Sequence, residues 1–388
     1  MTRRYELRTF AKYLPYELLK NYFISRNYPF DEKLVNEKSE SIDVETYING
    51  LEQEIVKKIN LDFAYANELS TEDGILSIVD YFNDSGIDLQ VEVKELENPQ
   101  SQALYTITNY SKLFENAFIR YYADDLTNKK ERIGIAQIDF DDDTLNKRTK
   151  DMEYALQTYL MANDGRGQNC KIELYRYQDR ICFLAYPEDY LKTAFRYNPK
   201  GTLERTTTKD VFEIIYIYYP EKRKLELSCK LRSPKRVKDL MKMFGDILLE
   251  DDTGFDDFQK TYELNKLLEE DFNFYSEPED KVEYIRLKKL RLANKYDTKE
   301  RITIETDSEN EDGMLPMREA LRQRNVNAKF WFVNQATIKL KYEGTGNKGG
   351  VTTQITFPDG CTLNDTSENH RKTKRYLELW GLTNGYGK

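Results

Sequence analysis

Residues 212–231 read FEIIYIYYPEKRKLELSCKL, and this stretch decides the fold of the middle of the chain. Isoleucine and tyrosine are interleaved between Ile214 and Tyr219, a pattern typical of a strand buried on one or both faces. Pro220-Glu221 has the chemistry of a turn, and Lys224–Leu231 follows as a second strand-forming run. The stretch therefore predicts a β-hairpin.

Helical and strand patterns alternate on both sides of this hairpin. Met152 and Leu156, for example, lie on one face of a helical repeat. The elements that we expect here are a helix over 144–162, strands over 170–176 and 180–186, and a helix over 234–249. Together with the hairpin they predict an α/β domain over residues 101–249.

The residue patterns differ towards the two ends of the sequence. Residues 1–100 carry apolar side chains at helical spacing, as at Ile75, Ile78 and Phe82, and predict a helical domain. Residues 250–280 are strongly acidic and predict a connecting segment. Residues 281–388 predict a strand-rich α+β domain, with strands over 282–292, 302–305, 336–342 and 351–357, helices near 314–325 and 367–380, and a winged-helix-like end around a glycine-rich loop. The expected fold class is mixed α/β (α+β).

The bulk composition describes an ordinary globular protein. The chain has 388 residues, of which 39% are hydrophobic and 33% charged, with a formal net charge of −9. This charge excludes a general polyanion binder but leaves room for a local basic face. We expect a soluble, cytoplasmic protein, because no apolar run suits a signal peptide or a membrane span and the four cysteines lack zinc-site spacing. The Lys-, Asn-, Ile- and Tyr-rich composition favours a bacterial source.

The sequence contains a single histidine, His370, within a charged run. A chain with one histidine cannot build a multi-histidine metal site, and any catalytic triad would have to use this residue. We expect His370 on a solvated helix face. The sequence thus predicts neither a resident metal nor a cofactor, and it excludes most hydrolase, metalloprotease and deaminase mechanisms.

One hypothesis for catalysis needs no histidine. Restriction-type nucleases hold Mg²⁺ with an acid and the Glu of a Glu-x-Lys strand, while the Lys steadies the attacking water. Glu92 and Lys94 would share one face of a strand over 89–94, and Asp80 is a candidate for the first acid, as are Asp84 and Asp88. An exposed strand face without catalysis explains the same pattern.

Clusters of basic residues are the local evidence for nucleic-acid binding. The first group lies between Lys222 and Lys242, where acids are few, and includes Lys230, Arg232, Lys235, Arg236 and Lys238. A second group is Arg286, Lys288, Lys289 and Arg291, and a third runs from Arg371 to Arg375. Clustered cations gain affinity for phosphate backbones by counterion release. Each group could instead pair with acidic stretches of the same chain, and Arg166 in a glycine-rich loop could be a further exposed contact.

These observations favour a protein that works by binding. We expect a non-enzymatic adaptor subunit of a larger, bacterial assembly, with protein partners and a possible contact to nucleic acid. Separated charge blocks and abundant tyrosine suit such surfaces. The alternative is a Mg²⁺-dependent nuclease centred on Glu92 and Lys94 with Asp80. The oligomeric state stays open at this point.

Overall fold

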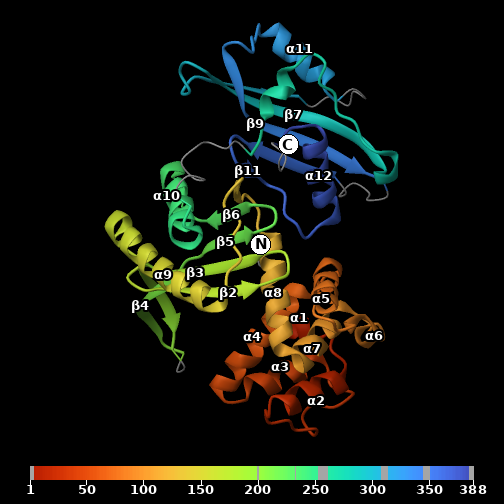
Figure 1. Cartoon of the computed structure of the whole chain (residues 1–388). Helices are drawn as coiled ribbons and strands as arrows, with labels where there is room; N and C mark the ends of the chain where they lie inside the picture. The colour runs from red at the N-terminus through yellow and green to blue at the C-terminus, as the bar shows by residue number, and fades with distance from the viewer. Residues whose placement is uncertain are drawn as a thin grey trace. The chain divides into compact units, whose positions relative to one another are not determined.

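The structure is a computed structural model that describes residues 4–198, 201–231, 233–251, 261–306, 313–343 and 350–383 (Figure 1). The chain divides into two compact units, residues 1–125 and residues 126–388. We call them the helical unit and the sheet unit. Helices and an antiparallel sheet both form large parts of the chain, which confirms the mixed α/β fold class.

The described residues of the helical unit form helices only. They are α1 (Leu7–Ala11), α2 (Tyr16–Ser25), α3 (Ser41–Asn49), α4 (Gln53–Leu69), α5 (Glu72–Asp84), α6 (Leu89–Val93), α7 (Pro99–Asn109) and α8 (Ser111–Asp125). Their core contains the fully buried rings of Tyr22, Phe23, Phe63 and Phe82. The unit extends past the boundary predicted at residue 100, because Leu104 of α7 and Phe114 of α8 belong to the same core.

The sheet unit contains both predicted regions that follow. Its strands are β1 (Lys130–Ile133), β2 (Cys170–Arg176), β3 (Ile181–Tyr197), β4 (Leu203–Val211), β5 (Ile214–Tyr219), β6 (Lys224–Cys229), β7 (Val282–Asn294), β8 (Arg301–Glu305), β9 (Trp331–Tyr342), β10 (Gly350–Thr356) and β11 (Gly360–Cys361). Its helices are α9 (Asp142–Asp164), α10 (Pro234–Phe244), α11 (Leu315–Gln323) and α12 (Glu368–Leu379), with short turns at Gly245–Leu249, Leu264–Leu268 and Pro278–Asp280. The predicted 212–231 hairpin is confirmed as β5 and β6.

All of these strands join one antiparallel sheet. The order is β2-β3-β5-β6-β1-β11-β10-β9-β7-β8, and β4 pairs with β3 outside this path. The regions predicted as separate domains over 101–249 and 281–388 therefore share a sheet. The short strand β1 makes the connection, because Lys130 pairs with Leu227 of β6 on one side and with Gly360 of β11 on the other.

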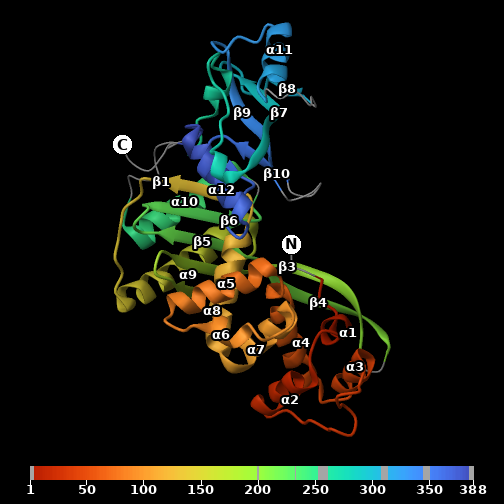
Figure 2. The ribbon, with the colours of Figure 1, turned by 90° about the vertical axis from the view of Figure 1, so that its right-hand side faces the viewer.

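The two halves of the sheet carry their helices on opposite faces. Directly paired residues share a face, and the pairs run from Thr356 through Gly360 and Lys130 to Leu227 and Tyr216. Tyr216 and Leu227 pack with α9 and α10. In β10 the buried residue is instead Ile355, on the other face, where the core includes side chains of α11 and α12. Figures 1 and 2 show these layers.

Two predicted features of the C-terminal region have a different structural context. Part of the acidic 250–280 segment is core, because Tyr262, Leu264 and Leu267 are buried; residues 252–260 lie outside the described residues. The strands of the winged-helix-like end are β9 and β10, which are internal strands of the large sheet. The glycine-rich loop over 344–349 lies outside the described residues.

Strand β3 continues beyond the sheet and forms a two-stranded ribbon with β4. Its first half pairs with β2 and β5, whereas Leu191–Tyr197 pairs with β4 alone. Figure 2 shows the ribbon projecting from the sheet. Neither β4 nor this extension of β3 is predicted by the sequence patterns. None of the helices in the described ranges combines the length and hydrophobicity that a transmembrane helix needs.

Candidate functional site

The residues of the nuclease hypothesis do not lie on a strand. Residues 89–93 form the helix α6, because Leu89 and Val93, one helical turn apart, are both buried in the helical core. The predicted strand over 89–94 is therefore wrong. Glu92 accepts hydrogen bonds from the hydroxyls of Tyr105 (3.1 Å) and Tyr110 (2.9 Å), Lys94 caps α6, and Asp80 is exposed on α5. Since two residues apart on a helix do not face each other, Glu92 and Lys94 lose the shared face that the mechanism requires.

The first basic group is divided by the structure. Arg236 pairs with Asp164 and donates to the carbonyl of Asn163 at 3.3 Å, so it ties α10 to the end of α9. Lys230 and Lys235 are exposed, and Lys238 is half-buried on α10. Arg232 lies outside the described residues. Among the members of this group that the structure describes, Lys230 and Lys235 are therefore the exposed cations.

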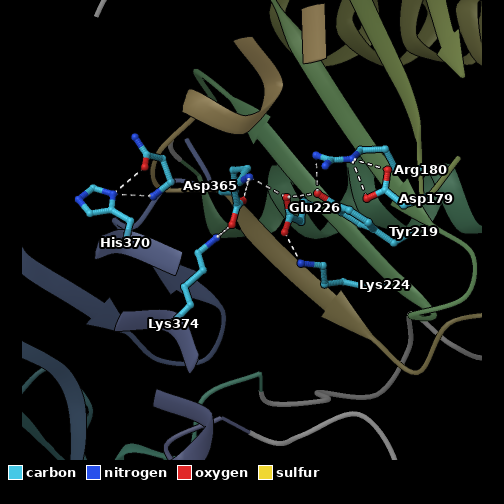
Figure 3. Close-up of polar contacts among 10 residues, drawn as sticks. Asp179, Arg180, Tyr219, Lys224, Glu226, Asp365, His370 and Lys374 are labelled. Carbon is cyan, nitrogen blue, oxygen red and sulfur yellow. Dashed lines mark hydrogen bonds and ion pairs between the residues drawn. The ribbon is translucent and has the colours of Figure 1, made fainter. Parts of the chain in front are cut away.

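A buried cluster of charges crosses the centre of the sheet unit (Figure 3). The side chain of Lys129 is 2% exposed, and its ammonium lies 2.8 Å from a carboxylate oxygen of Glu226 and 2.9 Å from one of Asp365. Figure 3 shows Glu226 and Asp365 of this cluster together with Lys224 and Lys374. Lys224 pairs with Glu226, and Lys374 pairs with Asp365 at 2.6 Å. The cluster joins β6, the start of β1 and α12, so it fixes the two halves of the sheet unit to each other.

Burial and ion pairing act in opposite directions on the pKa values of Lys129, Glu226 and Asp365 in this cluster. Burial alone would lower the pKa of Lys129, but Glu226 and Asp365 outweigh burial and raise this pKa above its ordinary value. Burial also opposes ionisation of the two acids. The surrounding lysines nevertheless lower the pKa of Glu226 well below its usual range and that of Asp365 to about 2. Every charge thus has a partner, as expected for a structural cluster.

A cavity of about 500 Å³ opens beside the cluster and is lined by Glu131, Lys374 and Tyr262 among others. Burial raises the pKa of the Glu131 carboxyl. No set of three His, Cys, Asp or Glu side chains in the described part of the chain is placed to hold a metal ion. The cavity therefore has no metal-binding arrangement among its described residues.

Two further residues that the sequence singles out have structural partners. His370 is half-buried rather than on a solvated face, and its Nδ1 lies 2.6 Å from the side-chain oxygen of Asn364. Arg166 pairs with Asp189 at 2.6 Å, and its guanidinium lies 4.0 Å from the ring centre of Phe212. Arg166 therefore anchors the root of the β3–β4 ribbon, and it is not an exposed phosphate contact.

The second basic group does lie on a continuous surface. On the face of β7–β10 opposite the hydrophobic core, the pairing brings cations from three strands together: Arg286, Lys289, Arg291, Arg301, Lys339 and Lys341. We call this surface the basic sheet face. Its neighbours on β10 are polar and uncharged, namely Thr352, Gln354 and Thr356. On β9, apolar residues alternate with Lys339 and Lys341, and this alternation is the sequence signal for the basic side of the strand. A search for runs of basic residues does not find it.

Acids neutralise only part of the basic sheet face. Lys289 pairs with Glu305 at 2.5 Å and Lys341 with Glu283 at 2.6 Å. Lys339 lies 5.8 Å from the ring centre of Tyr284, and within the described ranges it has no carboxylate partner. Arg291 likewise has no carboxylate partner within the described ranges, and the residues opposite it on the neighbouring strands are Gln335 and Thr303.

Comparison of the chain with known protein families, with curated proteins and with solved structures finds no match. No relative therefore assigns a role to the buried cluster, the basic sheet face or the ribbon. The function has to be argued from the residues themselves.

Proposed function

We propose that this protein acts by binding nucleic acid, and that the basic sheet face contacts the phosphate backbone. The observation that carries the proposal is the position of Lys339. It is directly opposite Arg286 of β7 and next to Thr352 of β10, and none of the residues that the structure describes gives it a carboxylate partner. Like charges directly opposite each other destabilise a sheet. A bound polyanion removes this repulsion, and the release of repulsion adds to its affinity.

The chemistry of the whole face supports the same ligand. Threonine and glutamine side chains on β10 and β9 can donate hydrogen bonds to phosphate oxygens, as Arg291 and Lys339 can. Cations outnumber carboxylates on the described part of this face, although the whole chain has a net charge of −9. The proposal includes no catalysis, and it replaces the nuclease hypothesis, whose strand is a helix.

Fluorescence anisotropy with labelled duplex DNA tests the proposal. We expect Arg291→Glu/Lys339→Glu to weaken binding at least tenfold, since reversing a phosphate contact replaces attraction with repulsion. The matched control is Lys230→Glu/Lys235→Glu, which makes the same change of charge at exposed lysines near and on α10, and which should bind almost as the wild type does. If the control loses as much affinity as the first variant, the site is wrong. If the wild-type protein binds no nucleic acid at low salt, the function is wrong.

We also propose that this role is exercised in the cytoplasm as a subunit with protein partners. All four cysteines are free thiols, which suits a reducing compartment. The helical unit exposes large apolar side chains, including Ile24 (57%), Leu34 (61%) and Leu61 (52%), that a protein partner would cover. Light scattering on the protein purified from its native source tests this part, and a lone monomer would contradict it.

A further inference from the structure

The β3–β4 ribbon exposes aromatic rings that no core requires. The side chains of Phe195 and Tyr197 are 70% and 74% exposed, and Leu203 on β4 is 54% exposed. An isolated two-stranded ribbon gains little stability in water without a packed face. These rings therefore add little to the stability of the fold. We take their exposure as a sign that they contact a ligand.

The pairing register separates the ribbon into two chemically different faces. One face carries Leu191, Thr193, Phe195 and Tyr197 of β3 together with Leu203, Arg205, Thr207 and Lys209 of β4, and its paired positions from Leu191 outward contain no acid. We call it the ribbon face. Phe195 is directly opposite Arg205, and Tyr197 is directly opposite Leu203. Two rings on alternate residues of one strand lie about 7 Å apart along it.

The charges of the ribbon are balanced at its root and unbalanced further out. At the root, Lys192 pairs with Asp189 (3.1 Å) and Asp210 (3.5 Å), and Lys209 lies 3.4 Å from Glu188. Further out, Arg196 and Arg205 have no ion-pair or hydrogen-bond partner in the described part of the chain. Glu204, the acid nearest to them on β4, accepts a hydrogen bond from Asn198 at 2.6 Å. Arg196 is directly opposite Glu204, whereas Arg205 is directly opposite Phe195. The outer ribbon therefore combines exposed rings with one arginine, Arg205, that has no acid opposite it.

One symmetric pairing of this surface with a second copy of the chain is disfavoured by charge. Symmetric antiparallel pairing of two β4 edges centred on Thr207 would place Arg205 against Lys209 and Glu204 against Asp210. Like charges directly opposite each other disfavour this pairing. Single-stranded nucleic acid, in contrast, uses both kinds of side chain on the ribbon, since unpaired bases stack on aromatic rings and phosphates contact cations.

We propose that the ribbon face binds single-stranded nucleic acid, with unpaired bases stacked on Phe195 and Tyr197 and with Arg205 contacting the backbone. This inference rests on the proposed function, because it names the form of nucleic acid that one surface takes. It adds a contact that is separate from the basic sheet face and that requires bases released from pairing.

Anisotropy with a labelled single strand and, in parallel, with the duplex tests the inference. Phe195→Leu/Tyr197→Leu removes both π faces but keeps the ribbon apolar, and we expect single-strand binding to weaken about tenfold with duplex binding unchanged. Phe195→Tyr/Tyr197→Phe keeps both rings and should bind as the wild type does. Tyr154→Leu, which removes a ring that is 72% exposed on α9, is the control for loss of any exposed aromatic.

The outcomes separate this inference from the function on which it rests. Unchanged single-strand binding in the double leucine variant overturns the inference, while duplex binding that responds to Arg291 and Lys339 leaves the function standing. If the wild-type protein binds neither the single strand nor the duplex, both the inference and the proposed function are wrong. If light scattering shows a wild-type dimer that the leucine variant dissociates, the ribbon is a protein interface and the inference is wrong.

Discussion

Replacing Lys129 with methionine removes the ammonium at the centre of the buried cluster and keeps a side chain of similar length. That ammonium lies 2.8 Å from Glu226 and 2.9 Å from Asp365, and the lysine side chain is only 2% exposed. Removing one partner of a buried ion pair costs about 3–5 kcal/mol. Because Lys224 and Lys374 still pair with the two acids, we expect the lower end of this range, about 3 kcal/mol.

Urea unfolding followed by tryptophan fluorescence measures this loss. Both tryptophans, Trp331 and Trp380, belong to the sheet unit, so their emission reports the unfolding of that unit. The control is Lys171→Met, since Lys171 pairs with Glu153 at 2.9 Å but is 72% exposed, and such a surface pair contributes no more than about 1 kcal/mol. If Lys129→Met were within about 0.5 kcal/mol of the wild type, the cluster would not stabilise the sheet unit as argued.

Two further perturbations test the buried cluster and the packing of β7. Folding lowers the pKa of Asp365 from 3.8 to about 2, so its stabilisation is complete above the unfolded pKa and is lost as the pH falls through about 2. The contribution of this group to the free energy of unfolding should therefore fall by about 2 kcal/mol between pH about 5 and about 2. An Asp365→Asn variant should lack this part of the pH dependence. If the stability of the variant depends on pH below about 5 as that of the wild type does, the assignment to Asp365 is refuted. In Gly313→Ala the new Cβ would lie 1.8 Å from the carbonyl oxygen of Ile285 on β7. We expect the free energy of unfolding, measured with urea, to fall by about 1–3 kcal/mol. An unchanged stability would show that the backbone of β7 can shift to accommodate the methyl group.

The elements of the core could be predicted from the sequence because burial gives them a regular pattern. The helix over 144–162, the 212–231 hairpin and the strands over 282–292 and 351–357 all bury one face or both, and their periodicity shows it. The segment over 89–94 misleads for the same reason. Leu89 and Val93 fit both a strand face and one turn of a helix, and packing in the helical unit favours the helix.

The surfaces proposed as functional are harder to predict from sequence. The ribbon strand LERTTTKDV is exposed along most of its length, so no core imposes an apolar alternation that would reveal a strand. The basic sheet face needs the pairing of β7 with β9, which are far apart in the chain and whose register shifts between Leu287 and Lys289. Charge runs identify Arg286 and Arg291 but cannot show that Lys339 lies opposite Arg286.

The salt dependence of duplex binding tests the central claim most directly. The logarithm of the association constant should fall linearly with the logarithm of salt concentration, with a slope that counts the phosphates contacted. We predict that Arg291→Gln/Lys339→Gln makes this slope shallower by about 2, one for each phosphate contact removed. An unchanged slope, or a wild-type protein that binds no duplex at low salt, would contradict the assignment of the basic sheet face as a phosphate-binding surface.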